Sequence, residues 1–121
     1  MNEPILAVVE DLIFLSKIQQ TARQIGVSVE PVEISKLAGR LQQGSSHAVI
    51  LDLNHRSGRA LETARAIKSS AESSKVHVLG FLSHVQADLA REARLTGLNQ
   101  VMARSAFTEQ LPELLRQLAA L

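Results

Sequence analysis

The sequence predicts one α/β domain with a mostly parallel five-stranded sheet and helices on both faces. Apolar runs, which are typical of strands buried on both faces, alternate with segments of helical period along the whole chain. No linker, repeat or low-complexity tract interrupts this alternation. A length of 121 residues suffices for one core but not for two. We therefore expect a single domain over residues 1–121.

The five strands are predicted from short runs of differing character. Residues 5–9 form a continuous apolar run, whereas residues 27–32 alternate and contain Pro31. Proline cannot donate to a strand ladder, so this second run is expected at a sheet edge. Residues 48–53 are apolar except for Asp52, near the end of the run. Residues 76–81 and the short run 101–103 complete the set.

The segments between these runs have apolar residues at helical spacing. Gly26, Gly44 and Gly97 follow three of them as stop signals. In the last helix, Thr108 is a plausible N-cap and Pro112 is tolerated in the first turn. The five stripes are Leu15, Ile18, Ala22 and Ile25; Ile34, Leu37, Ala38 and Leu41; Ala60, Ala64 and Ile67; Val85, Leu89 and Ala93; and Leu111, Leu114, Leu115 and Leu118.

Five consecutive βα units in a domain of this length fit the flavodoxin-like sheet with strand order 2-1-3-4-5. In such a sheet, ligands gather at the carboxyl ends of strands 1 and 3. Here those ends carry Glu10, Asp11 and Asp52, so we expect the three carboxylates to meet at one edge.

Composition excludes several classes of function. A net charge of +1 and only three aromatic residues argue against nucleic-acid binding. No apolar stretch approaches the roughly 20 residues that span a bilayer, and the first four residues lack a signal peptide's basic start, so we expect a cytoplasmic protein. The chain has no cysteine, and it lacks the Ser-His-Asp, HExxH, GxSxG and GxGxxG patterns, so we do not expect an enzyme.

Over its whole length the chain resembles a response-regulator receiver domain. In that family an acidic pair after strand 1 binds Mg²⁺, and Glu10 and Asp11 match this pair. Asp52 matches the aspartate after strand 3 that accepts a phosphoryl group. The resemblance thus implies a possible Mg²⁺ site of Glu10, Asp11 and Asp52, and a histidine kinase or downstream effector as partner.

The chain departs from the receiver pattern at the positions that read the phosphate. Leu82 stands where the family has a hydroxyl after strand 4, and Ser83 comes one place late. Arg104 and Ser105 replace the Lys-Pro pair after strand 5, whose usual aromatic is also absent. These departures are typical of a divergent receiver, or pseudo-receiver.

Several of these residues also have structural interpretations. Asp52 could bond backbone N–H groups or an arginine, and Asp11 could cap the first helix. Ser83 begins a Ser-x-x-Gln capping box that ends at Gln86. Arg104 could clamp Asp52 permanently or face solvent. Ser83, Arg104, Ser105 and Arg56 are the candidates for contacting an anion.

Three functions follow from this pattern. The favoured one is a stand-alone receiver-like module that acts by binding another protein, independently of phosphorylation or atypically. The first alternative is a response regulator phosphorylated on Asp52 by a histidine kinase, and the second is a small-anion or nucleotide sensor using Arg56, Arg59 and Arg104. We also expect a homodimer through the last two βα units, which carry Arg91, Glu92, Arg94, Glu109 and Glu113.

Overall fold

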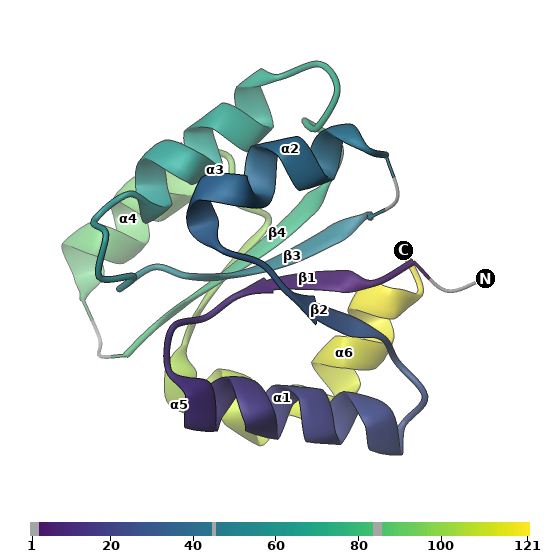
Figure 1. The fold of residues 1–121 in the computed structure, drawn as a ribbon. Helices are drawn as coiled ribbons and strands as arrows, with labels where there is room; N and C mark the ends of the chain where they lie inside the picture. Colours follow the sequence, from purple (N-terminus) through teal and green to yellow (C-terminus); the bar gives the residue numbers. More distant parts are fainter. Residues whose placement is uncertain (1–2, 45, 84–85) are drawn as a thin grey trace.

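The computed structural model describes residues 3–44, 46–83 and 86–121. Its five strands form one parallel sheet in the order β2-β1-β3-β4-β5, which confirms the predicted fold class (Figure 1). The strand with Pro31 lies at the edge, as expected. The strands are β1 (Ile5–Val8), β2 (Val29–Pro31), β3 (Ala48–Asp52), β4 (His77–Leu82) and β5 (Gln100–Ala103).

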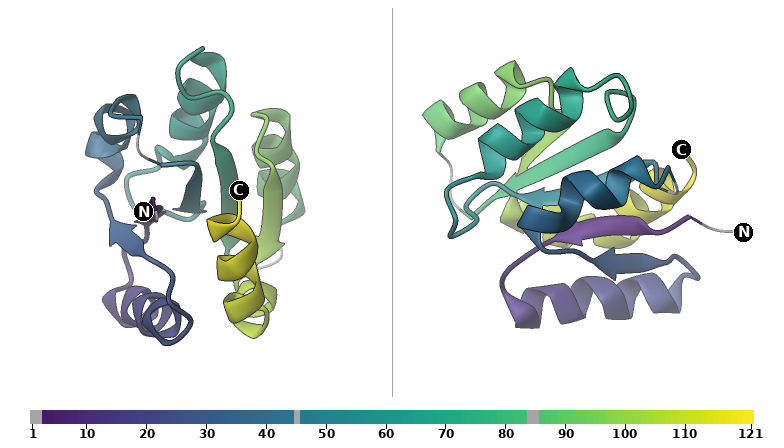
Figure 2. Two further views of the ribbon diagram at one scale, coloured as in Figure 1. Left: turned by 90° about the vertical axis from the view of Figure 1, so that its right-hand side faces the viewer. Right: turned by 45° about the horizontal axis from the view of Figure 1, so that its top comes forward.

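Helices cover both faces of the sheet (Figures 1 and 2). One face carries η1 (Ile34–Lys36), α2 (Leu37–Gln42), α3 (Ala60–Ser69) and α4 (Ala87–Leu95). The other carries α1 (Leu12–Gln24), α5 (Arg104–Glu109) and α6 (Leu111–Ala119). In the described part of the chain, no helix is long and apolar enough to cross a membrane.

Successive side chains of the central strands enter the two cores alternately, because side chains of a strand point to opposite faces. In β3, Val49 and Leu51 join the core under α2, α3 and α4. Ala48 and Ile50 join the core under α1, α5 and α6. The carboxyl end of β3 is thus held between two packed layers, and Asp52 stands where that packing ends.

All three phenylalanines of the chain form one cluster in the second core. The rings of Phe81 and Phe107 are stacked with centroids 5.3 Å apart. Phe14 meets both edge-on, at 5.4 Å from Phe81 and 5.8 Å from Phe107. Such pairs add stability beyond the burial of their area. The cluster packs the first turn of α1 against α5 and β4.

Two predicted helix starts are wrong. The segment after β5 forms two helices, and Thr108 lies inside α5, where its hydroxyl donates to the Arg104 carbonyl at 2.8 Å. Gln110 is the N-cap of α6 instead, and Pro112 lies in the first turn as expected. The capping box at Ser83 does not form, because α4 begins after Gln86 and has no side-chain cap. Its middle residues, His84 and Val85, lie outside the described residues.

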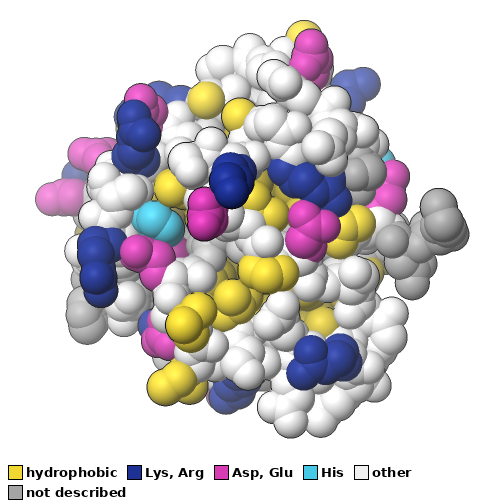
Figure 3. Space-filling view, viewed as in Figure 1, with side chains coloured by type: hydrophobic (Ala, Val, Ile, Leu, Met, Phe, Trp, Pro, Cys, Tyr) yellow, Lys and Arg dark blue, Asp and Glu magenta, His cyan; other side chains and the backbone are white. Residues whose placement is uncertain are grey.

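Charged side chains of opposite sign are interspersed on the face shown in Figure 3. Ion pairs at a spacing of three residues in the described part of the chain include Arg59 with Glu62 and Arg91 with Asp88. Exposed pairs of this kind contribute little to stability. The view shows no extended basic surface of the kind that nucleic acids bind.

Candidate functional site

The predicted acidic edge forms because β1 and β3 are neighbours in parallel register. Val8 lies opposite Leu51, so the residues after each strand emerge at the same edge of the sheet. Glu10 and Asp11 follow β1, and Asp52 ends β3. Adjacent carboxyl ends of parallel strands are where this fold places its ligands.

Asp11 is the N-cap of α1, one of the two roles expected for it. Its Oδ1 accepts hydrogen bonds from the N–H groups of Ile13 at 3.0 Å and Phe14 at 3.1 Å. These are two of the donors that a helix start leaves without a partner. One carboxylate oxygen of Asp11 is therefore committed to the helix.

Arg104 occupies the other oxygen of Asp11 and not Asp52. Its Nη2 donates to Asp11 Oδ2 at 2.8 Å, and its guanidinium carbon lies 4.0 Å from the centroid of the Phe14 ring. A planar cation can stack on an aromatic face while it donates from its edge. The Arg104 hydrogen bond lowers the pKa of the Asp11 carboxyl, and the bond from the Phe14 N–H lowers it further.

Glu10 is directed toward the loop between β3 and α3. Its Oε1 accepts a hydrogen bond from the Arg56 backbone N–H and lies 3.9 Å from Nδ1 of His55. The His55 side chain is largely buried there and also bonds the Ser57 hydroxyl at 2.8 Å. Glu10 therefore links the loop between β3 and α3 to the end of β1 by a hydrogen bond.

Asp52 is half-buried, and its Oδ1 accepts a hydrogen bond from the Asn54 N–H at 2.9 Å. Burial raises the pKa of the Asp52 carboxyl, and the Asn54 bond offsets part of that rise. The negative charge of Glu10 raises this pKa as well, whereas the positive charge of Arg104 lowers it. Within the described residues, Asp52 Oδ2 makes no hydrogen bond.

The Asn54 side chain connects the Asp52 loop to the segment after β4. Its Oδ1 accepts from the Ser83 N–H at 2.6 Å, and its Nδ2 donates to Gln86 Oε1 at 2.8 Å. The backbone of the same residue holds Asp52. A single asparagine thus joins the carboxylate to the segment that precedes α4.

The three carboxylates do not fit a Mg²⁺ ion as they are arranged. Both oxygens of Asp11 are bonded, and Glu10 is turned to Arg56. Among the described residues, no group of three or more histidine or acidic side chains is placed to hold a metal. A helix cap and an arginine thus bond Asp11, and a loop N–H bonds Glu10, whereas Asp52 keeps one unbonded oxygen within the described residues. The Mg²⁺ site of Glu10, Asp11 and Asp52 stays a prediction.

Solved structures of receiver domains are similar to this chain over nearly its full length. The chemotaxis protein CheY4 of Vibrio cholerae is 16% identical, with 98% of this chain and 99% of that one covered and a TM-score of 0.82. A response regulator from Thermotoga maritima is 15% identical, with full coverage of both chains and a TM-score of 0.78. The receiver domain of a Pseudomonas aeruginosa sensor histidine kinase, solved with magnesium in its active-site cleft, is 18% identical, with full coverage of both chains and a TM-score of 0.77.

The chain has the receiver-domain fold. The predicted resemblance is confirmed at this level. No protein-family model matches the sequence, and no curated protein matches it.

The positions that the resemblance aligned with phosphate contacts lie at the ends of β4 and β5. Leu82 is buried in the core under α3 and α4 and has no polar group to offer. Ser83 is exposed, and its backbone N–H is held by Asn54. Ser105 is exposed in the first turn of α5. Val101 and Met102 of β5 are half-buried, as are the other two residues of that strand.

The arginines expected to bind an anion do not converge. Arg104 pairs with Asp11 and Arg59 with Glu62, whereas Arg56 contributes its backbone N–H to Glu10. Carboxylates thus pair with the side chains of Arg104 and Arg59, whereas the Arg56 side chain makes no ion pair within the described residues. The geometry therefore does not favour the small-anion or nucleotide sensor.

Sequence reasoning missed two residues of this site. Asn54 was expected only as part of a loop, and Phe14 carried no polar signal. The position of Asn54, two residues after the aspartate, favours an Asx-type turn and could have indicated its backbone bond to Asp52. No local signal indicates the stacking of Arg104 on Phe14, because 90 residues separate them in sequence and the fold brings them together.

Replacing Asp52 with asparagine is expected to stabilise the protein by about 0.5–1 kcal/mol at pH 7. Burial and the negative charge of Glu10 both destabilise the charged carboxylate. Asparagine avoids this charge and keeps the oxygen that accepts a hydrogen bond from the Asn54 N–H. The raised pKa means that the folded state binds this proton more tightly. The gain should therefore shrink as the pH falls through that raised pKa. Urea unfolding at pH 7 and pH 4 checks this, and a less stable variant at pH 7 would contradict it.

Proposed function

We propose that the chain is a receiver-like signalling module that binds another protein and does not use phosphorylation of Asp52 as its switch. It has no catalytic activity of its own and works in the cytoplasm. The observation that carries this proposal is the ion pair of Arg104 with Asp11, stacked on Phe14. A positive charge already lies at the acidic edge, and it is supplied by the chain itself.

A phosphorylation switch needs an element with two arrangements that the new charge can bias. The residues here favour one arrangement. Leu82 has no hydroxyl to move toward a phosphoryl oxygen, and Asn54 holds the Ser83 N–H. Arg104 is held between an acidic group and an aromatic ring. These contacts support a module whose surface is constant.

Exposed apolar side chains beside the site support the proposal that the chain binds another protein. Leu12 and Ile13, in the first turn of α1, are 76% and 85% exposed, although they adjoin the Asp11 cap. Large apolar groups placed together at the surface commonly mark contact sites. The partner we propose is a histidine kinase or a downstream effector that covers this end of α1.

The second candidate function is a response regulator that accepts a phosphoryl group on Asp52 from a histidine kinase. Its support is the place of Asp52 at the carboxyl end of β3 and the unbonded Oδ2 within the described residues. Receivers that work in this way bind Mg²⁺, and the carboxylates as folded do not fit it. We therefore rank this candidate second.

Incubation with acetyl phosphate and Mg²⁺, followed by intact-mass measurement, separates the two functions. The proposed function predicts no mass increase corresponding to one phosphoryl group, in wild type or in Asp52→Asn. An active receiver domain treated in parallel shows that the reagent is competent. A phosphoryl adduct in wild type that Asp52→Asn abolishes would overturn the proposal and establish the second function.

Self-association through the last two βα units stays a prediction. Arg91 and Glu113, two of the charges expected to meet across a two-fold axis, also pair within their own helices, with Asp88 and Arg116. A dimer must exchange these pairs for intermolecular ones, so we expect it to weaken as salt rises. Light scattering at low and high salt checks this. A monomer at both, up to high micromolar concentration, would exclude it.

A further inference from the structure

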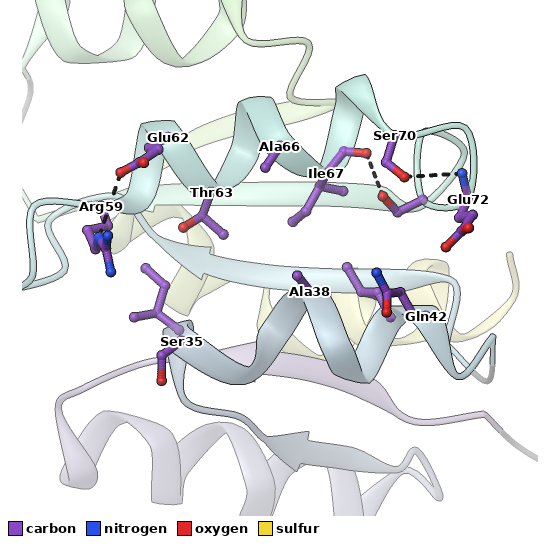
Figure 4. Close-up of a pocket in the computed structure, with 13 residues that line it drawn as sticks. Ser35, Ala38, Gln42, Arg59, Glu62, Thr63, Ala66, Ile67, Ser70 and Glu72 are labelled. Carbon is purple, nitrogen blue, oxygen red and sulfur yellow. Dashed lines mark hydrogen bonds and ion pairs between the residues drawn. The ribbon is translucent and has the colours of Figure 1, made fainter.

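A groove lies between α2 and α3, on the face of the sheet opposite α1 (Figure 4). It encloses about 270 Å³ and reaches Leu41 and Ile67, which belong to the core beneath these helices. Ala38 of α2 and Ala66 of α3 line it, and both are exposed. These small side chains leave the space between the helices open. Its volume is just below the roughly 300–1,000 Å³ of small-molecule pockets, so a small ligand would fill it.

An unused hydroxyl points into this groove. Helical serines and threonines commonly donate to the carbonyl four residues earlier, and Thr21, Ser69 and Thr108 do so in this chain. Thr63 of α3 makes no side-chain hydrogen bond within the described residues, and its side chain is directed toward α2 (Figure 4). A mainly apolar groove lined by a few polar groups is typical of sites that orient a ligand, and Ser35 and Gln42 also line this one.

The two ends of the groove differ in charge. At one end Arg59 and Glu62 form an ion pair at 3.7 Å, so their charges cancel. At the other, the Ser70 hydroxyl holds the N–H of Glu72, whose carboxylate makes no ion pair within the described residues. Lys68, close by in sequence, is turned away, because its Nζ donates to carbonyls before β4. The lining therefore carries one unbalanced negative charge, at the Glu72 end.

We propose that this groove binds a small, mainly apolar organic cation. The apolar body would lie on Leu41 and Ile67 between the two alanines, and the ammonium group would lie at Glu72. The Thr63 hydroxyl would contact a polar atom along the body. Asp52 does not line the groove, so this inference goes beyond the proposed function and does not depend on it.

Two probes with similar bodies and opposite charge test the proposal. The full chain, labelled with ¹⁵N, is titrated with 4-phenylbutylamine and separately with 4-phenylbutanoate. The amine is expected to shift the amide signals of Ala38, Thr63 and Ala66 saturably and to bind about two- to fivefold more tightly than the acid. No saturable shift with either probe, equal binding of both, or shifts that avoid these residues would each overturn the proposal.

Three variants sharpen the test. Glu72→Gln is expected to remove the preference for the amine while the acid binds as before. Ala66→Leu fills the groove and should abolish the shifts, whereas Ala119→Leu, on an exposed face of α6, should leave them unchanged. If the amine binds Ala66→Leu as it binds wild type, or keeps its preference in Glu72→Gln, the proposal is wrong. A folded far-ultraviolet circular dichroism spectrum is required of each variant.

Discussion

Replacing Arg104 with alanine is expected to tighten Mg²⁺ binding at the acidic edge by about tenfold, the scale of removing a unit charge close to a divalent ion near the surface. In wild type the guanidinium donates to Asp11 Oδ2 and places a positive charge beside Asp52. The variant frees that oxygen, while Asp11 Oδ1 remains bonded to the start of α1. Titration of ¹⁵N-labelled protein with MgCl₂ measures the change.

The same variant should alter the pH dependence of stability. Arg104 lowers the pKa of Asp11, so this carboxylate stabilises the fold above its unfolded-state pKa and loses that effect as the pH falls through the lowered value. Without Arg104 the pKa of Asp11 returns toward its ordinary value. The stability difference between wild type and Arg104→Ala should therefore be larger at pH 7 than at pH 2.

Two controls accompany Arg104→Ala. Arg104→Lys keeps the charge but loses the planar fork, so Mg²⁺ affinity should stay within about threefold of wild type. Arg116→Ala removes an exposed arginine that pairs with Glu113 on α6, and it should not change Mg²⁺ binding. If Arg104→Ala binds Mg²⁺ with the affinity of wild type, Arg104 does not weaken Mg²⁺ binding at the acidic edge.

Replacing Phe107 with alanine is expected to lower the free energy of unfolding by about 3–5 kcal/mol. Phe107 is completely buried, stacks on Phe81 at 5.3 Å and meets Phe14 at 5.8 Å. The variant leaves a cavity in the core under α1, α5 and α6 and breaks two of the three ring contacts. Because the chain has no Trp or Tyr, urea unfolding is followed by far-ultraviolet circular dichroism.

Two further substitutions distinguish the effect of lost packing in the core from the effect of removing an apolar side chain anywhere. Phe107→Leu keeps most of the volume and should cost less than Phe107→Ala by about 1–3 kcal/mol. Leu95→Ala removes an apolar side chain that is 80% exposed and should change stability by less than about 0.5 kcal/mol. A loss below about 1 kcal/mol for Phe107→Ala would show that the cluster does not stabilise the fold as its geometry indicates.

The sheet, its strand order and the position of the acidic edge could be predicted from local sequence patterns. Short apolar runs such as residues 48–53 predict buried strands, because the signal lies within a few consecutive positions. The end of each run then places Glu10, Asp11 and Asp52, because parallel strands present their carboxyl ends at one edge. The cap by Asp11 was also predictable, since a cap bonds residues two or three positions away.

The other bonds of this acidic edge depend on contacts between segments far apart in the sequence. Arg104 could have clamped Asp52, yet it bonds Asp11, because the phenylalanine cluster places the ring of Phe14 beneath the guanidinium. Asn54 bonds Ser83, which displaced the capping box expected there. These contacts join residues 29 or more positions apart, and no local pattern encodes the direction of a side chain at that range. Local periodicity fixes where a carboxylate emerges, whereas packing between distant segments selects its partner.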